Sequence, residues 1–367
     1  MVTSFAASFR EPDQLAAAFS AGRGQLTITR PGKFSSNIMS ADFGRLFLIH
    51  GESNLATVAH LELVPDRVTF SFLPGVSSGV LNDGQEVRQN QISQHCLGRS
   101  WYQTMLRPAP WGGILLAPEE IEGMAAIFGS ARRSPRQSHD IIPSAQAVQR
   151  LMRLYSMAVR LMLDAPEMLQ RPEAMRGLEH AVIEALAGCL IGDELPGETV
   201  GQRNHATVMR QFHRLLADNP ADTLFLADVC DAIGVSARTL RACCETHLSM
   251  GPKHFLTLRR MHLARCALRE GGGNASVTDV ATQFGFWELG RFAVAYRALF
   301  GESPSATSGR RAARASSQTG EADTAAPNDP VHAWFGPQWL AALSWLPDFH
   351  FDSHRWGAAT GPELTPV

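Results

Sequence analysis

Several side chains in this 367-residue chain are of the types that hydrolyse bonds or hold metal ions. Ser77 lies in the run Gly75–Gly79, a G-x-S-x-G pattern that serine hydrolases use when a strand precedes the serine and a helix follows it. The residues that follow here, "VLNDGQEV", are instead typical of a β-hairpin, and no triad partners are evident. We therefore interpret the serine pattern as a chance match.

Histidines and acidic residues are present but lack the spacing of a metal site. Four histidines stand singly in the N-terminal part, with no H-x-H pair: His50, His60, His95 and His139. The run "DFHFDSH" offers four more candidate ligands that fit no zinc or calcium pattern, namely Asp348, His350, Asp352 and His354. The expectation is no metal and no cofactor, and the sequence assigns no cofactor-binding residues.

Two arginines, Arg241 and Arg291, lie on the polar sides of two helical patterns. The apolar sides of these patterns contain Leu240 and Phe292, so both guanidinium groups should face outward. Such a group is either a solvated surface charge or a donor of two parallel hydrogen bonds, for example to the edge of a guanine. Which role applies depends on the kind of structural unit in which the two helices lie.

The two patterns belong to an internal repeat. "VCDAIGVSARTLRACCETHLSMGP" (Val229–Pro252) aligns with "VATQFGFWELGRFAVAYRALFGESP" (Val280–Pro304), with one extra residue in the second turn. Matching apolar positions recur every fourth residue in each copy: Leu240, Cys244 and Leu248, then Phe292, Tyr296 and Phe300. Each copy predicts a short helix, a turn containing glycine and a second helix, with Ser236 as a natural N-cap. A duplicated helical hairpin inside an ordinary bundle is the structural alternative.

A connector lies between the two copies, over residues Pro252–Arg269. A continuous helix of this length would be about 27 Å long, whereas successive major grooves on one face of B-DNA are about 34 Å apart. The region from Arg203 to Arg311 holds 14 Lys+Arg and 9 Asp+Glu, which leaves 19 and 26 for the rest of the chain. A basic region within an acidic protein suggests a local electrostatic footprint.

This region resembles the AraC/XylS family of bacterial transcription regulators. The resemblance is carried by "LADVCDAIGVSARTLRACCE", "FLTLRRMHLARCAL" and "VTDVATQFGFWELGRFAVAYRALFGESPS", and it covers about Asn204–Ser308. It implies sequence-specific binding of double-stranded DNA through both second helices, usually by dimers. It also implies a variable N-terminal domain that senses a small molecule or mediates association.

The resemblance further implies that exposed residues near the start of each second helix meet the DNA. In the first copy these are Ser236, Arg238, Thr239, Arg241 and Ala242. In the second copy they are Leu289, Gly290, Arg291, Ala293 and Val294. The second set is mostly small or apolar, so we expect it to touch thymine methyl groups or to position the backbone. Arg260 on the connector is expected to be structural.

The pattern along the chain predicts an α+β fold. Short strand-like runs from about Gly44 to Pro118 indicate an antiparallel sheet or a cupin-like barrel, and Ser144–Leu163 and Pro172–Leu190 indicate an amphipathic helical pair. The predicted segments are a sensor domain (1–143), a helical pair able to dimerise (144–191), a linker (192–202), a double helix-turn-helix domain joined by a long helix (203–309), a disordered linker (310–330) and a Trp-rich tail of unknown role (331–367).

The six cysteines form no C-x-x-C pair, which favours a reducing compartment. The chain has neither a signal-peptide pattern nor an apolar stretch long enough to span a bilayer, so a cytoplasmic location without a membrane partner is expected. The sequence thus predicts a non-enzymatic DNA-binding transcription regulator. Its expected partners are double-stranded DNA, a small-molecule effector, a second copy of the chain and RNA polymerase. Two alternatives stay open: a metabolite-converting enzyme with a helical accessory domain, and a DNA-binding protein without effector control.

Overall fold

The computed structural model describes ten stretches of the chain. They are residues 3–19, 25–62, 66–75, 77–97, 100–128, 138–191, 193–194, 199–219, 222–270 and 276–309. The expected linker 310–330, the Trp-rich tail 331–367 and the Asp/His run within that tail lie outside the described residues.

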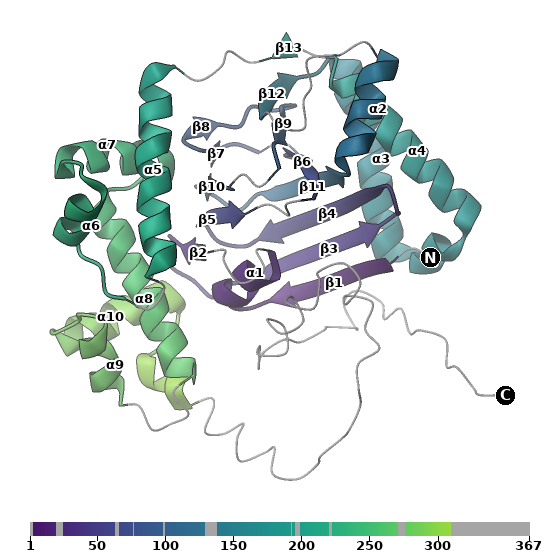
Figure 1. The fold of residues 1–367 in the computed structure, drawn as a ribbon. Helices are drawn as coiled ribbons and strands as arrows, with labels where there is room; N and C mark the ends of the chain where they lie inside the picture. Colours follow the sequence, from purple (N-terminus) through teal and green to yellow (C-terminus); the bar gives the residue numbers. More distant parts are fainter. Residues whose placement is uncertain are drawn as a thin grey trace, which may run out of the picture.

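Two antiparallel sheets build the N-terminal half (Figure 1). The larger sheet has the order β1-β3-β4-β11-β6-β9-β12-β13, with strands Thr3–Phe9, Ser36–Asp42, Leu46–Ser53, Pro110–Leu116, Val68–Phe72, Ile92–His95, His139–Ile142 and Asp193–Glu194. The smaller sheet has the order β2-β5-β10-β7-β8, with strands Gln25–Ile28, Thr57–Glu62, Ser100–Met105, Val80–Asn82 and Gln85–Glu86. Neither sheet closes on itself within the described residues. The α+β class is confirmed, with open sheets rather than a closed barrel.

Strand β6 illustrates how the sequence creates two different faces. Successive side chains of a strand point to opposite sides, and Val68 and Phe70 enter the core on one side. Thr69 and Ser71, on the other side, line a cavity between the sheets. The predicted hairpin is also confirmed, because Asp83 and Gly84 connect β7 to β8 with φ of 47° and 80°.

The predicted helical pair covers the face of the larger sheet that lies away from the cavity. α3 (Ala145–Asp164) is capped by Ser144, and α4 (Pro172–Cys189) follows a 3-10 turn (Pro166–Gln170). Tyr155 of α3 is buried and donates a hydrogen bond to the Ile49 carbonyl at 2.9 Å. With α2 (Pro118–Phe128), the pair shares one core with the sheet.

Some elements were not expected from the sequence. Strands β1, β2 and β3 and helix α1 (Pro12–Phe19) precede the predicted strand region, which began at about residue 44. β12 lies beyond the predicted strand region, which ended at about Pro118, and β13 lies in the expected linker 192–202. That linker also contains the start of the next helix, α5, because Thr199 and Gln202 form a capping box there.

The C-terminal half is a set of helices grouped around one long helix, α8. The helices are α5 (Val200–Asp218), α6 (Leu226–Ile233), α7 (Ala237–Leu248), α8 (Pro252–Glu270), α9 (Val277–Gln283) and α10 (Leu289–Phe300). α8 is continuous over 19 residues, a length of about 28 Å. The predicted connector helix is therefore confirmed, and it runs between the α6–α7 pair and the α9–α10 pair.

A buried ion-pair network joins the two halves. The guanidinium of Arg265 on α8 donates two 2.8 Å hydrogen bonds to the carboxylate of Glu11, just before α1, and one of 2.7 Å to Glu302. Arg269, one turn later, bonds Asp13 at 3.0 and 3.1 Å. Burial alone would lower the pKa of Arg265, but the bonds and charge of Glu11 raise that pKa above its ordinary value. We call Arg265, Arg269, Glu11, Asp13 and Glu302 the junction network.

Backbone contacts extend this junction to both helical pairs. The Ile28 N–H of β2 donates to His262 Nε2 on α8 at 3.1 Å, and the Gly32 N–H donates to the Leu299 carbonyl of α10 at 3.0 Å. On the other side, the Thr104 hydroxyl of β10 donates to the His247 carbonyl of α7 at 2.9 Å. The sheets therefore contact the long helix and the second helix of each pair.

We predict that Glu11→Ala destabilises the protein, because it leaves two buried arginines short of a partner. Removing one partner of a buried ion pair lowers the free energy of unfolding by about 3 kcal/mol or more. We expect a loss of about 3 kcal/mol here, because Arg265 keeps its hydrogen bond to Glu302. Urea denaturation would measure it. Glu173→Ala is the matched control, since Glu173 pairs with Arg176 on an exposed surface and should change the unfolding free energy little. Equal effects of the two substitutions would contradict the role given to Glu11.

We also predict that acid weakens the fold through His262. Burial lowers the pKa of His262 to about 4, whereas the unfolded chain has a histidine pKa of about 6.5. The unfolded state therefore binds more protons between these values, and stability falls as the pH drops from about 6.5 toward 4, by about 2 kcal/mol at pH 5 for this group. His262→Gln keeps an acceptor for Ile28 but cannot titrate. In urea denaturation at pH 7.5 and 5.0, the variant should lose less stability than the wild type; an equal loss would exclude His262 as a source.

Candidate nucleic-acid interface

The two predicted copies of the repeat have the same turn. Gly234 and Gly285 follow the first helix of each pair and adopt left-handed conformations, with φ of 67° and 74°. The next N–H in each turn, that of Val235 or Phe286, donates back to the carbonyl five residues earlier, at 3.1 and 2.8 Å. A residue with a Cβ would be strained in this conformation, so glycine is needed at both turns. The repeat seen in the sequence is thus a repeat of backbone structure.

The apolar backs of the second helices are buried as predicted. Leu240, Cys244 and Leu248 of α7 are fully enclosed, and so is Tyr296 of α10, whose hydroxyl donates to Thr307 at 2.9 Å. Burial raises the pKa of the Cys244 thiol to about 12, so the neutral thiol packs as a small apolar group and is unsuited to redox chemistry.

The predicted contact residues of the first copy gather at the start of α7. Ser236 caps the helix by accepting the Thr239 N–H at 3.0 Å. All five residues are exposed: Ser236, Arg238, Thr239, Arg241 and Ala242. The Arg241 side chain lies along its own helix and bonds Glu245 at 2.8 Å. This surface therefore presents two arginines and two hydroxyl groups.

The second copy presents a more apolar surface at the start of α10. Leu289, Gly290, Arg291 and Val294 are exposed and Ala293 is half-buried. Arg291 is held by Glu288 at 2.9 Å. Arg241 and Arg291 thus each pair with an acidic residue three or four positions away in the chain.

Trp287 is a residue of this surface that the sequence interpretation did not single out. It is 77% exposed and lies immediately before Glu288, the N-cap residue of α10. The turn of the second copy has one residue more than the turn of the first, and this insertion falls at residues 286–287. The insertion is the feature of the sequence that indicates Trp287. An exposed tryptophan has a large apolar ring and a single N–H donor, a combination suited to a binding surface.

The arginines of the connector helix have structural roles. Arg260 lies between the rings of Phe225 and Phe286, 4.9 and 5.0 Å from their centres, and donates to the Phe284 carbonyl at 3.3 Å. Arg259 is buried and donates to the carbonyls of Leu216, Asn219 and Asp222. The expectation that Arg260 is structural is therefore confirmed, and this residue ties the start of α6 to the turn before α10.

The chemistry set aside at the sequence level finds no support in the described part of the chain. The residues after Ser77 form strand β7 rather than the helix that a hydrolase elbow requires. Among the described residues, no three His, Cys, Asp or Glu side chains gather closely enough to hold a metal ion. In the same stretches, no helix is both long and apolar enough to cross a bilayer.

Comparison with known proteins identifies the helical region. A protein-family model described as "Helix-turn-helix domain" matches residues 229–310, from within α6 to beyond the end of α10. Residues 229–310 form an AraC-type helix-turn-helix domain. The chain is similar to "XylDLEGF operon transcriptional activator 3" of Pseudomonas putida, with 34% identity over 122 residues, or 32% of this chain and 37% of that protein.

The chain is also similar to other proteins. The "Probable thc operon regulatory protein" of Rhodococcus erythropolis is 39% identical over 83 residues, or 22% of this chain and 25% of that protein. This chain thus matches well under half the length of these curated relatives. The solved structure of the AraC-like transcriptional activator CuxR overlays 72% of this chain and 96% of its own, with 14% identity and a TM-score of 0.39.

We predict that Ser236→Ala weakens the start of α7 by about 1 kcal/mol, because the Thr239 N–H loses its cap. Hydrogen exchange should accelerate at the first amides of α7 and stay unchanged in α10. Ser276→Ala is the matched control, since Ser276 caps α9 in the same way by accepting the Asp279 N–H at 3.0 Å. If exchange in α7 did not respond while DNA binding fell, Ser236 would be a direct contact and not a cap.

Proposed function

We propose that the protein is a sequence-specific, DNA-binding transcription regulator that acts in the cytoplasm and is not an enzyme. The observation that carries this proposal is the pair of matching helix-turn-helix units joined by the continuous helix α8. Their backs are buried and their exposed fronts contain Arg241 and Arg291. A connector of about 28 Å is close to the spacing of about 34 Å between successive major grooves on one face of B-DNA.

The two units would read DNA in different ways. In the first unit, Arg238 and Arg241 can each donate a pair of hydrogen bonds to a guanine, while Ser236 and Thr239 are suited to phosphates or base edges. Ala242 is small enough to let the helix approach the groove. The second unit would place Leu289, Gly290, Ala293 and Val294 against thymine methyl groups, with Arg291 as its cation. Trp287 would pack beside the sugar-phosphate backbone.

We further propose that the N-terminal half controls this activity by binding a small molecule. We keep the division into a sensor domain (1–143), a helical pair (144–191), a short linker within 192–202 and a DNA-binding domain (203–309). Helix α1 supports such control, because its Leu15 and Ala16 line the cavity between the sheets while Glu11 and Asp13 bond to α8. A molecule in the cavity can thereby shift the helix that joins the two units.

Association into dimers is part of the proposal. The face of α3 opposite the core includes Met157, which is 47% exposed in the single chain. A second copy could cover this side chain, and RNA polymerase is a further partner to be expected of a regulator bound near a promoter.

We predict that Arg241→Ala and Arg291→Ala alter DNA recognition at separate places. Footprinting of the full-length protein on its bound site should show relaxed base preference in one segment for Arg241→Ala, at a cost of about 1–3 kcal/mol. The segment affected by Arg291→Ala should lie about one helical turn away. Arg45→Ala is the control, because Arg45 is an exposed arginine of the sensor domain that pairs with Glu120. Wild-type footprints for both recognition variants would refute the groove assignment, and binding that did not weaken as salt rises would refute DNA binding itself.

A further inference from the structure

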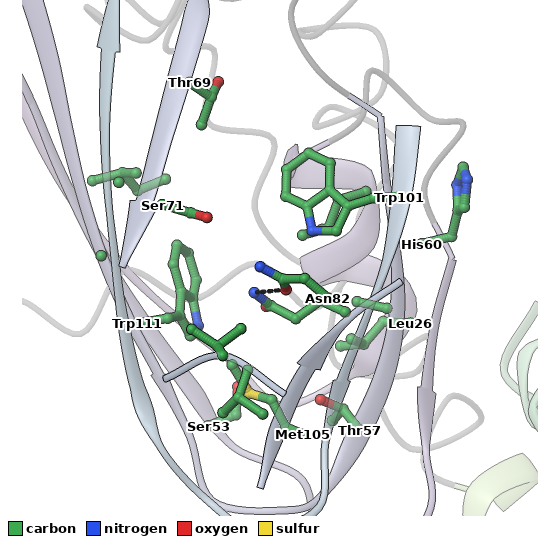
Figure 2. Close-up of a pocket in the computed structure, with 18 of the residues that line it drawn as sticks. Leu26, Ser53, Thr57, His60, Thr69, Ser71, Asn82, Trp101, Met105 and Trp111 are labelled. Atoms are coloured by element: carbon green, nitrogen blue, oxygen red, sulfur yellow. Dashed lines mark hydrogen bonds between the residues drawn. The ribbon is translucent and has the colours of Figure 1, made fainter. Parts of the chain in front are cut away.

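A cavity of about 150 Å³ lies between the two sheets (Figure 2). Its walls come from β5, β7 and β10 of the smaller sheet, from β6 and β11 of the larger one, and from α1. An apolar cavity of about this volume in another protein takes up one benzene molecule. The space therefore suits a molecule built on a single ring.

Two tryptophans define the shape of the cavity. Figure 2 shows the indole rings of Trp101 and Trp111 on either side of it, with the Asn82 side chain between them. Trp111 can lie where it does because residue 51, on the neighbouring strand β4, is glycine: a Cβ there would be 2.0 Å from the indole. Flat, polarisable walls of this kind favour an aromatic ring in stacked or edge-to-face contact.

The described lining carries no charge. It includes no Lys, Arg, Asp or Glu, and its one titratable side chain is His60. Burial, together with the nearby His213, lowers the pKa of His60 to about 2, so this histidine is neutral at physiological pH. A charged ligand would lose its hydration without gaining an opposite charge, which disfavours carboxylates and amines.

The lining does contain unsatisfied hydrogen-bonding groups. Trp101 is 5% exposed, and among the described residues neither its Nε1–H nor the buried Thr69 hydroxyl has a hydrogen-bond partner. The Oδ1 of Asn82 accepts a 3.4 Å hydrogen bond from the Gln103 amide, and Ser71 is bonded to His95 at 2.8 Å. A buried donor without an acceptor is unfavourable, and a ligand oxygen would satisfy the indole N–H.

We propose that this cavity binds a neutral, single-ring aromatic molecule that carries one oxygen acceptor, such as a carbonyl or hydroxyl group. The ring packs against the indole walls of Trp101 and Trp111 beside the Asn82 side chain, and the oxygen accepts the Trp101 Nε1–H. The regulatory consequence, but not the ligand class, rests on the proposed function: the ligand also contacts α1, which the junction network ties to α8.

The test uses the full-length protein and calorimetric titration with matched benzene derivatives. Benzaldehyde and benzyl alcohol should bind at least tenfold more tightly than benzoate and benzylamine, which have the same ring but carry a charge at neutral pH. Equal or tighter binding of benzoate or benzylamine, or no binding of any of the four, would overturn the proposal.

Trp101→Phe tests the hydrogen bond apart from the shape of the cavity. It keeps an aromatic ring but removes the donor, so benzaldehyde should bind about tenfold more weakly, whereas toluene, which has no acceptor, should bind as it does to the wild type. Val200→Ala is the control, because this side chain is 66% exposed and lies outside the cavity lining, so both affinities should stay unchanged. An equal loss for benzaldehyde and toluene in Trp101→Phe would refute the bond.

These titrations contain no DNA, so they can fail or succeed independently of the proposed function. Band shifts with the same protein, with and without benzaldehyde at saturating concentration, then test regulation. A change in DNA affinity supports transmission through α1 and α8. Unchanged affinity, with binding of benzaldehyde intact, refutes that transmission.

Discussion

The buried guanidinium of Arg265 determines how the two halves of the protein meet. A charge removed from water must be surrounded by partners, and those of Arg265 come from two distant parts of the chain, Glu11 before α1 and Glu302 after α10. The ring of Phe300 lies 4.8 Å from the same guanidinium. The corner of the larger sheet, the middle of α8 and the end of the second helix-turn-helix unit are therefore fixed relative to one another by one side chain.

This arrangement makes the two reading units parts of one body. Arg260 joins the start of α6 to the turn before α10, and the sheets contact α7 through Thr104 and α10 through Gly32. Movement of one unit relative to the other would have to break contacts made by the sensor domain. Within the described residues, hydrogen bonds thus join the N-terminal half to α7, α8 and α10.

The helical half could be predicted in detail because its signals are local. Aromatic or apolar residues at every fourth position fix the buried side of α10, and a glycine before each second helix fixes the turn. The identity of the base-reading residues rests on the family resemblance and on their exposure, and remains a prediction. Trp287 escaped notice because an exposed side chain leaves no periodic signal.

The junction network could not be predicted from the sequence, because its residues are far apart in the chain. Glu11 and Arg265 are 254 residues apart in sequence, and neither belongs to a pattern that indicates burial. Strand β3, "SNIMSAD", contains several polar residues and so gives no clear strand pattern. Its serines become buried only when β1 and β4 pair with it. The cavity depends on the same non-local pairing: Thr69 and Ser71 become its polar lining only when β6 faces the smaller sheet.

Gly51 gives the cavity a simple means of changing its selectivity. The indole of Trp111 occupies the space that a side chain at this position would need. An alanine there would push the ring inward and narrow the room for a guest, without touching the charge or the hydrogen-bonding groups of the walls. A single substitution on strand β4 is thus enough to reshape the cavity, while the exposed residues at the starts of α7 and α10 stay as they are.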